Sequence, residues 1–535
     1  MEIKTEFWGT AKDGKKIYKY YVTNGSGAQV VLTSLGASIV SVLVPDKDGK
    51  LRDVSLGFDT PEDAALYYLA GLKNQDFEQM LAAFAWETQA DHFDFRSFTA
   101  YMKGFNPVSV PGMPFSNGLL YSAELEEMRT RQAWLISRAL ELFVNNEMET
   151  SATRTVIMKD EAEIDEYFGR CDNGWPEQFA SLENIRIYTP DDVTEGMFSH
   201  EMNQASYQKR NARYGADETR DVIVFADTEA ATVGIMPVAA RYGDRWYLVS
   251  TSSMTSMILG IAVNCQAVFA VPEELAETVK GIEPAARVSD LPDRNREAIR
   301  YEGSGFGTPE EAAEYYLEGL KNQNIQQMLG AFAWETQNSR YSLKDYILRM
   351  QCVNETAAIR MPAFSSLMAG SNLCSLRYVQ ANRIQKALRR YVLAEADRFS
   401  EFLEGYNVSF DGDEDIDAFI ALYDNDRAGK LAAMSGVRFA DPASVIPKYD
   451  TEQTKELLGK YRDIYGAEEI RELIGTADLG GETLLFNPIL ARYGDRWFIV
   501  TVQGIAFSLL GADYQRQAFF TFPGTLEDYL RQLQQ

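Results

Sequence analysis

The chain has 535 residues, of which 46% are hydrophobic and 24% are charged, a composition typical of a globular protein with several cores. At roughly 100–200 residues per domain, this length predicts about two to four domains. Lys and Arg number 52 and Asp and Glu number 78, so the net charge is −26. This charge would repel a phosphate backbone, and we therefore expect no nucleic-acid partner.

Histidine and cysteine usage narrows the possible chemistry. With 2 histidines in the chain, any metal site or proton relay that needs three of them is excluded. The four cysteines form no C-x-x-C pair, which favours free thiols in a reducing compartment over a disulfide frame or a zinc site. They are Cys171, Cys265, Cys352 and Cys374.

Two stretches bear on location. The N-terminal residues are polar and charged and do not resemble a signal peptide, so we expect a cytoplasmic protein. Residues 254–271 carry no charge and are almost long enough to span a bilayer. Because this stretch contains polar side chains such as Asn264 and Gln266, we expect a buried strand or helix there and no membrane span.

The chain contains an internal duplication. Residues 60–89, TPEDAALYYLAGLKNQDFEQMLAAFAWETQ, and residues 308–337, TPEEAAEYYLEGLKNQNIQQMLGAFAWETQ, are identical at 23 of 30 positions, at an offset of 248. Later, ARYGDRWYLV at 240 matches ARYGDRWFIV at 491, an offset of 251. A period of this size is that of a domain. We therefore predict two tandem domains, 60–282 and 305–535, joined by a polar linker at 283–304.

Residues 1–59 have no counterpart in the second copy and carry eight basic and seven acidic side chains, a net charge of +1. Their segments GTAKDGKKIYKYYVTN, LGASIVSVLVPDKDGK and DVSLGFD resemble the N-terminal part of aldose 1-epimerases, the galactose mutarotases. The resemblance implies the opening strands of a β-sandwich that binds a hexose and interconverts its anomers by acid–base catalysis. It stops at Asp59, and the family's motifs that supply catalytic His and Glu and sugar-binding Arg are absent, so no catalytic residue is assigned.

Each copy is predicted to open with two short helices and to continue with a long one. Thr60 is a good N-cap, Pro61 suits the first helical position, and Asp63 completes a capping box. The polar step at residues 73–76 predicts a break before a second helix. Residues 122–144 carry a broad apolar stripe, which predicts a long helix in the middle of the copy.

The end of each copy changes to the periodicity of strands. Residues 222–225, 232–240 and 246–250 are predicted strands, the last two joined by a tight turn at Gly243-Asp244. A short N-terminal antiparallel β segment followed by two duplicated domains with helical starts and hairpin-rich ends predicts an α+β fold. The opening helices and the Gly-Asp-Arg-Trp strand also resemble the cone-shaped domains of the nuclear-transport-factor and ketosteroid-isomerase type. This second resemblance implies a curved sheet with a mouth for a small ligand.

Aromatic and acidic residues shared by the two copies are the candidate ligand-binding residues. The aromatic rings could line a ligand mouth, although rings at such spacing commonly fill cores. The two glutamates follow tryptophans and are either carboxylates in an apolar setting or solvated residues at a helix end. The set is Tyr67, Trp86, Glu87, Trp246, Tyr315, Trp334, Glu335 and Trp497.

No motif indicates a cofactor or a metal. In the acidic run at 410–419, Ile416 stands where a calcium loop needs glycine, and Leu422 stands where its last glutamate would be. We therefore expect a protein without catalytic activity that binds a small molecule, such as a carbohydrate, or a protein partner. The alternative is a hexose isomerase of the aldose 1-epimerase type, in which residues 1–59 complete a sugar site with the repeats.

Overall fold

The computed structural model describes residues 2–10, 15–34, 39–45, 51–53, 57–102, 104–105, 118–145, 155–194, 200–261, 266–292, 299–353, 357–392, 408–511 and 518–533. The chain divides into two compact units, Met1–Asp59 and Thr60–Gln535. Cys265 and residues 293–298 of the expected linker lie outside the described residues.

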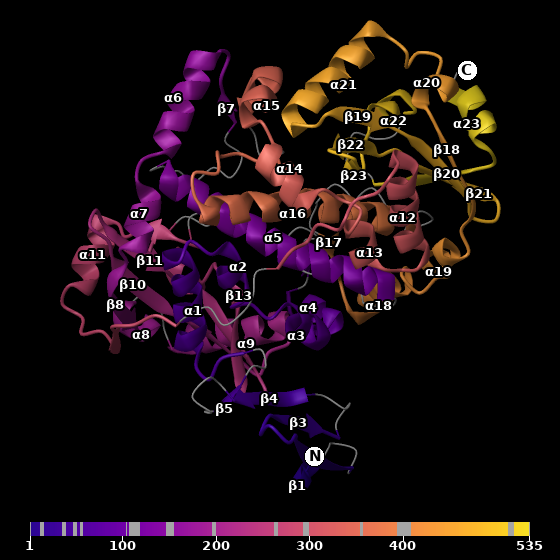
Figure 1. Cartoon of the computed structure of the whole chain (residues 1–535). Helices are drawn as coiled ribbons and strands as arrows, with labels where there is room; N and C mark the ends of the chain where they lie inside the picture. The colour runs from indigo at the N-terminus through magenta and orange to yellow at the C-terminus, as the bar shows by residue number, and fades with distance from the viewer. Residues whose placement is uncertain are drawn as a thin grey trace. The chain divides into compact units, whose positions relative to one another are not determined.

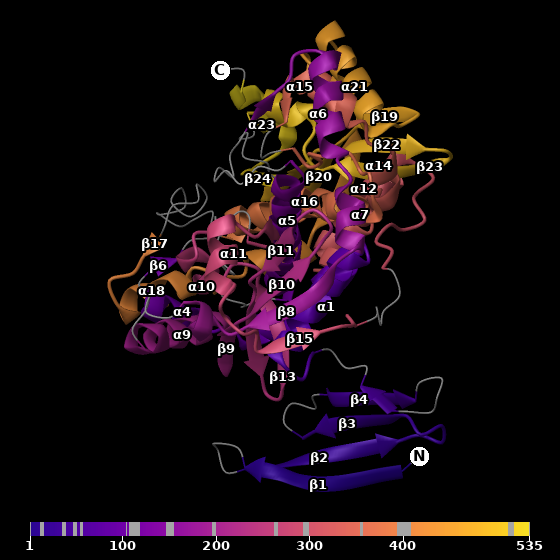
Figure 2. The same ribbon diagram turned by 90° about the vertical axis from the view of Figure 1, so that its left-hand side faces the viewer.

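The first unit is a five-stranded antiparallel sheet in which each strand pairs with the next one along the chain (Figure 2). The antiparallel β segment expected from the sequence is thus present. Among the side chains described in this unit, Val31 alone is buried. The strands are β1 Glu2–Thr10, β2 Lys16–Thr23, β3 Gln29–Thr33, β4 Ile39–Pro45 and β5 Leu51–Asp53.

The second unit begins with the first copy of the repeat, which is helical at its start and rich in strands at its end (Figure 1). Its helices are α1 Pro61–Lys73, α2 Phe77–Leu81, α3 Trp86–His92, α4 Phe95–Met102, α5 Gly118–Val144, α6 Glu161–Cys171, α7 Trp175–Ala180, α8 Pro190–Val193, α9 His200–Tyr214, α10 Met254–Ile258 and α11 Glu273–Val279. Its strands are β6 Gly104–Phe105, β7 Val156–Ile157, β8 Glu183–Tyr188, β9 Glu218–Asp221, β10 Ile223–Asp227, β11 Thr232–Ile235, β12 Val238–Tyr242, β13 Arg245–Ser250, β14 Phe269–Ala270 and β15 Ala286–Val288.

The second copy repeats this order of elements, so the fold is α+β, as predicted. Its helices are α12 Pro309–Lys321, α13 Ile325–Leu329, α14 Trp334–Arg340, α15 Leu343–Met350, α16 Ser366–Val392, α18 Asp413–Ala421, α19 Arg427–Ala432, α20 Pro442–Val445, α21 Glu452–Tyr465, α22 Ile505–Leu509 and α23 Leu526–Leu533. Its strands are β16 Cys352–Val353, β17 Val408–Ser409, β18 Ser435–Ala440, β19 Glu469–Glu472, β20 Ile474–Asp478, β21 Glu482–Phe486, β22 Ile489–Tyr493, β23 Arg496–Thr501 and β24 Phe520–Pro523.

The predicted helix starts are confirmed by their hydrogen bonds. Thr60 Oγ1 accepts a hydrogen bond from the backbone N–H of Asp63 at 3.1 Å and caps α1. Asp76 accepts one from the N–H of Gln79 at 3.0 Å and caps α2 after the predicted break. Each cap satisfies a backbone donor that the first helical turn leaves without a partner.

The strand expected over residues 232–240 is two strands, β11 and β12, which belong to different sheets. Pro237 lies between them and has no N–H to offer to a ladder. Its carbonyl accepts a hydrogen bond from Val222 N at 3.0 Å. The first copy therefore has one sheet of order β14-β11-β10-β8-β15 and another of order β13-β12-β9. In the second copy, the corresponding sheets are β18-β20-β21-β24 and β19-β22-β23.

The two copies interlock through elements at equivalent places. The long helices α5 and α16 pack against each other, and the rings of Trp134 and Tyr378 stack there at 5.5 Å (Figure 1). β6 of the first copy pairs with β17 of the second, and β16 of the second pairs with β7 of the first. Since β6 and β16 occupy the same place in the two copies, the exchange is reciprocal, as between subunits of a two-fold dimer.

The segment expected to be a linker, 283–304, takes part in the structure of both copies. β15 pairs with β8 as the outer strand of the first copy's larger sheet. In the second copy, Glu335 accepts hydrogen bonds from the backbone N–H groups of Tyr301, at 2.7 Å, and Glu302, at 2.8 Å. These contacts use backbone groups, which every sequence offers, so apolar periodicity does not reveal them.

Residues 254–271, for which we expected a buried strand or helix, include the short helix α10 and the strand β14. Within the described part of the chain, no helix combines the length and the apolar character needed to cross a bilayer.

Candidate functional site

The tryptophans shared by the two copies are core residues. Trp334 stacks on Phe332 at 4.7 Å, and its indole N–H donates a hydrogen bond to Leu329 O at 2.8 Å. None of the four lines either of two pockets in the second copy, of about 390 and 980 Å³. Each is 8% exposed or less: Trp86, Trp246, Trp334 and Trp497.

The other candidates from the sequence differ in burial and in what they contact. Tyr67 is buried in α1, whereas Tyr315 is 36% exposed and packs against Phe306 at 5.1 Å. Glu87 is exposed on α3. Glu335 holds the backbone ahead of the second copy through the two hydrogen bonds already described. These four side chains line neither pocket.

A pocket of about 390 Å³ lies in the second copy where α14, α15, α16 and α21 meet the end of β23. Four tyrosines line it, and we call it the tyrosine pocket: Tyr341, Tyr346, Tyr461 and Tyr465. Tyr461 and Tyr465 are one helical turn apart on α21, so their rings share a face and stack at 5.9 Å with 11° between their planes. Tyr341 lies 6.1 Å from Tyr465 and 6.2 Å from Tyr346, measured between ring centres.

Two arginines provide the charge of the tyrosine pocket. The guanidinium of Arg349 lies 4.3 Å from the ring centre of Tyr461 and donates to its hydroxyl at 3.3 Å. Arg383, on α16, donates to Thr501 Oγ1 and to Gln380 Oε1. No Asp or Glu is among the described residues that line this pocket. Burial raises the pKa of Tyr341 well above its usual value, so this hydroxyl stays neutral and can donate a hydrogen bond.

The first copy has different residues at the equivalent positions. At the offset of 248, Tyr341 and Tyr346 correspond to Phe93 and Phe98. Arg349 corresponds to Tyr101, and Arg383 corresponds to Leu135. On α21, at the offset of 251, Tyr461 corresponds to Arg210 and Tyr465 to Tyr214. The second copy therefore differs from the first in where its arginines and tyrosines stand around this pocket. Comparing the two copies position by position in the sequence would have pointed to these pocket residues.

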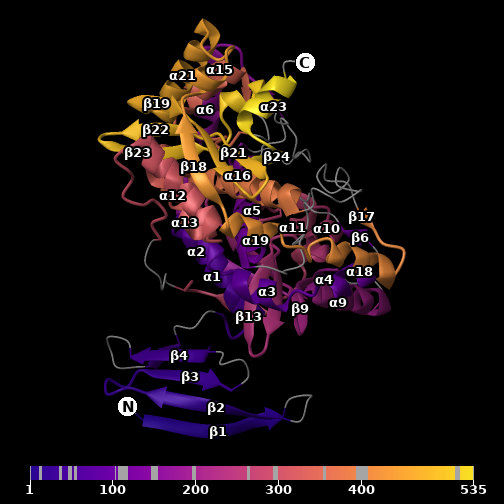
Figure 3. The same cartoon turned by 90° about the vertical axis from the view of Figure 1, so that its right-hand side faces the viewer.

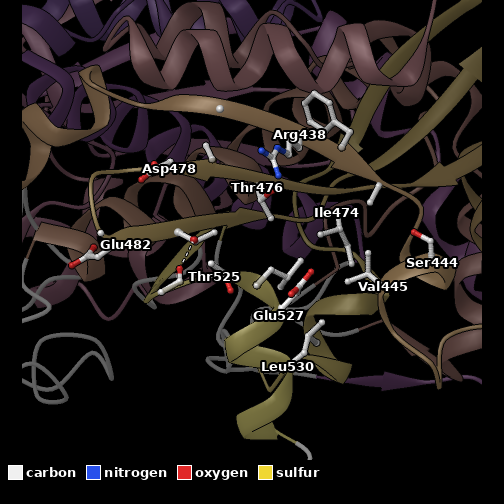
Figure 4. A pocket seen from close by; sticks show the side chains of 18 residues that line it. Arg438, Ser444, Val445, Ile474, Thr476, Asp478, Glu482, Thr525, Glu527 and Leu530 are labelled. Carbon is white, nitrogen blue, oxygen red and sulfur yellow. Dashed lines mark hydrogen bonds between the residues drawn. The ribbon is translucent and has the colours of Figure 1, made fainter.

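A larger pocket, of about 980 Å³, lies between the sheet of β18, β20 and β21 and the helix α23. We call it the sheet pocket. Figure 4 shows Arg438, Thr476 and Ile474 on the side of the sheet and Glu527 and Leu530 on the side of α23. Its lining mixes charged groups, hydroxyls and aliphatic side chains.

Two residues that line the sheet pocket are much smaller than their counterparts in the first copy. In the first copy, Tyr188 of β8 and Phe225 of β10 lie on this face of the sheet and pack at 5.5 Å. β8 and β18 have the same register, since Arg186 pairs with Phe225 and Arg438 pairs with Thr476. Ala440 and Thr476 thus stand where the first copy has two large rings.

Charge pairing beside the sheet pocket also differs between the copies. Arg186 donates to both carboxylate oxygens of Asp227, at 2.7 and 2.6 Å. The equivalent pair in the second copy is Arg438 and Asp478, at offsets of 252 and 251. Within the part of the chain that the structure describes, the guanidinium of Arg438 has no hydrogen-bond or ion-pair partner.

Among the described residues, no group of three or more His, Cys, Asp or Glu side chains could hold a metal ion. The acidic run at 410–419 contains the start of α18, with Asp413, Glu414 and Asp415 in the first helical turn. Acidic side chains there favour the helix because they face its positive end.

Comparisons with known proteins give one structural likeness. No family model and no curated protein sequence matches the chain. A crystal structure of a cystatin-like protein from Ruminococcus gnavus ATCC 29149 is similar to 89% of this chain and 95% of its own, with a TM-score of 0.49 and 13% identity. This likeness assigns no function to the chain.

Proposed function

We propose that the second copy binds a small organic anion in the tyrosine pocket and that the protein acts as a ligand-binding protein. One observation carries the proposal. Arg349 and Arg383 both line this pocket and no described lining residue is acidic, although the chain as a whole has a net charge of −26.

The electrostatics of the tyrosine pocket favour an anion. A guanidinium forms strong paired hydrogen bonds with a carboxylate or a phosphate. Within the lining, Arg349 contacts the ring and hydroxyl of Tyr461, and Arg383 contacts the amide of Gln380 and the hydroxyl of Thr501, all of which are neutral groups. A bound anion would add a negative charge beside both guanidinium groups.

The shape and the rings favour a ligand with a flat body. The volume of about 390 Å³ lies within the roughly 300–1,000 Å³ of small-molecule sites. Tyrosine rings offer apolar faces for packing, and their hydroxyls offer hydrogen bonds. The general expectation of a small ligand thus narrows to a carboxylate or phosphate carried by an aromatic or sugar ring.

A thermal-shift screen tests the proposal with defined probes. Phenyl phosphate, benzoate and glucose 6-phosphate represent anions on the two kinds of ring, and benzyl alcohol and glucose are their neutral counterparts. We expect at least one anion to raise the melting temperature in a saturable manner and the neutral compounds to leave it unchanged, because only binding to the folded state stabilises it. Equal shifts with neutral and anionic probes would contradict the proposal.

A further inference from the structure

The outer edge of β18 is open in the second copy. β18 pairs with β20 on one side, and no described strand pairs with its other side (Figure 3). In the first copy, the equivalent strand β8 pairs with β10 on one side and with β15 on the other. The same fold therefore accommodates an extra strand at this edge.

An apolar residue that is buried beside β15 in the first copy has an exposed counterpart at the open edge of β18. Asn184 in β8 and Gly436 in β18 hold equivalent places, and both have positive φ, 50° and 59°. The next residues are Ile185 and Val437. Ile185 is paired with Val288 of β15 and is 2% exposed, whereas Val437 is 36% exposed. Strand edges that stay open are usually protected by charge or irregularity, and an apolar residue there marks a place for pairing.

The sheet pocket adjoins this edge, since β18 contributes Gly436, Arg438, Phe439 and Ala440 to its lining. The sheet pocket differs from the same place in the first copy in two ways. The space taken by the rings of Tyr188 and Phe225 is open, and Arg438 lacks the carboxylate that Arg186 has.

We propose that β18 and the sheet pocket together bind an extended peptide segment of a protein partner. The segment runs antiparallel to β18, as β15 runs along β8. Its residue opposite Arg438 is acidic and pairs with the guanidinium. Its residue opposite Ala440, two positions earlier, is aromatic and fills the sheet pocket. The recognised pattern is aromatic, any residue, acidic.

The register of β15 gives these positions. Ala286 lies opposite Ile187 and Arg287 lies opposite Arg186. By the same register, Ala285 lies opposite Tyr188, the counterpart of Ala440. Residues two apart in a strand point to the same face, so the positions of Ala285 and Arg287 both face the side of the sheet that holds the pocket.

Among the described residues that line the pocket, Arg438 is the basic one, and the acidic ones are Asp478, Glu482 and Glu527. Glu527 lies on the side of α23. Glu482 is paired with Arg427 at 3.1 Å. Asp478 lies opposite Ser435, at the far end of β18 from Ala440, and accepts a hydrogen bond from Gly480 N at 2.7 Å. Backbone pairing supplies affinity in such strand addition, and the alternate side chains supply specificity.

Fluorescence anisotropy with a labelled peptide tests the proposal. The probe has the sequence of residues 283–290 with Ala285→Phe and Arg287→Glu, and it is titrated with the whole protein. We expect saturable binding that weakens about tenfold when either change in the peptide is reversed, since a buried aromatic ring or a lost charged partner has effects of this size. In the protein, Arg438→Glu and Val437→Lys should weaken it to a similar degree. Lys321→Glu, an equal charge reversal on α12, should not.

Three results would overturn the proposal. One is the absence of saturable binding by the probe. Another is binding that Arg438→Glu and Val437→Lys both leave unchanged, which would place the peptide elsewhere. The third is a dimer in light scattering that Val437→Lys dissociates, because the occupant of the edge would then be a second copy of the chain.

Discussion

Arg377 of α16 and Glu126 of α5 form an ion pair between the two copies, with 2.6 Å between Nη2 and Oε1, and both side chains are 4% exposed. A second pair, Arg389 with Glu124, joins the same helices at 3.2 Å. At these places α5 supplies the acids and α16 supplies the bases. The duplicated helices have therefore diverged into complementary partners.

Removal of one partner of this pair should destabilise the protein strongly. Arg377→Met leaves Glu126 buried without its cation, and we expect a loss of about 3–5 kcal/mol in the free energy of unfolding. The double variant Arg377→Met with Glu126→Leu should recover most of this loss, since no buried charge then lacks a partner. Urea denaturation of the wild type and the variants measures both effects. A single variant as stable as the wild type would show that the pair is not formed.

A methyl group at Gly319 should destabilise the helix pair α12–α13. A Cβ at this position would lie 2.7 Å from the backbone nitrogen of Met328, and the same close approach recurs at Gly71 in the first copy. Although alanine favours helices, we expect Gly319→Ala to cost about 1–3 kcal/mol because backbone must move. Gly429→Ala in α19 is the control, with nothing within 4 Å of the new Cβ, and should stabilise by about 0.5–1 kcal/mol. If Gly319→Ala were more stable than Gly429→Ala, the close packing at Gly319 would be contradicted.

Stability should depend on pH through Glu472. Burial raises the pKa of this carboxyl, which accepts hydrogen bonds from Ala506 N at 2.6 Å and Tyr449 Oη at 2.7 Å. In the first copy the equivalent Asp221 pairs with Arg210, and Tyr461 takes the place of that arginine in the second copy. A carboxyl with a raised pKa holds its proton more tightly in the folded state. Its contribution to stability therefore rises as the pH falls through the folded pKa toward the unfolded value near 4.5.

The variant Glu472→Gln tests this dependence. We expect the free energy of unfolding of the wild type, relative to the variant, to increase as the pH falls from the alkaline side toward the unfolded value near 4.5. Glu310→Gln, at an exposed position on α12, is the matched control. A difference between Glu472→Gln and wild type that stays constant over this range would contradict the raised pKa.

Residues 1–59 should be the first part of the chain that a protease cleaves. Among the side chains described in this unit Val31 alone is buried, so local opening of these residues exposes little apolar surface and costs little free energy. Limited proteolysis followed by mass spectrometry should find early cuts in this unit while residues 60–535 stay intact. A protease-resistant fragment that contains residues 1–59 alone would contradict the expectation.

Local patterns predicted the elements but not the interlocking of the copies. Thr60 and Asp76 marked helix starts through side chains close in sequence to the groups they bind. The pairing of β6 with β17 joins residues about three hundred positions apart and uses backbone groups, for which the sequence has no local signal.

Shared residues pointed to the core, and unlike residues pointed to the pockets. Trp86 and Trp334 are identical between the copies, and each is buried and stacks on an equivalent phenylalanine, Phe84 or Phe332. Arg383 stands at a place where the first copy has Leu135, and Thr476 stands where it has Phe225. Residues that differ between the copies indicate a binding site only when the fold shows that they line a cavity.

Isothermal titration of the tyrosine pocket tests the central claim most directly. The anion with the largest thermal shift is titrated into the wild type and into the variant Arg349→Tyr with Arg383→Leu, which restores the residues of the first copy. Arg462→Leu, an exposed arginine of α21 outside the pocket, is the matched loss of charge. We predict that the wild type and Arg462→Leu bind alike and that the double variant binds at least about a hundredfold more weakly, given about 1.5–3 kcal/mol per charged hydrogen bond. Unchanged affinity in the double variant would contradict the account.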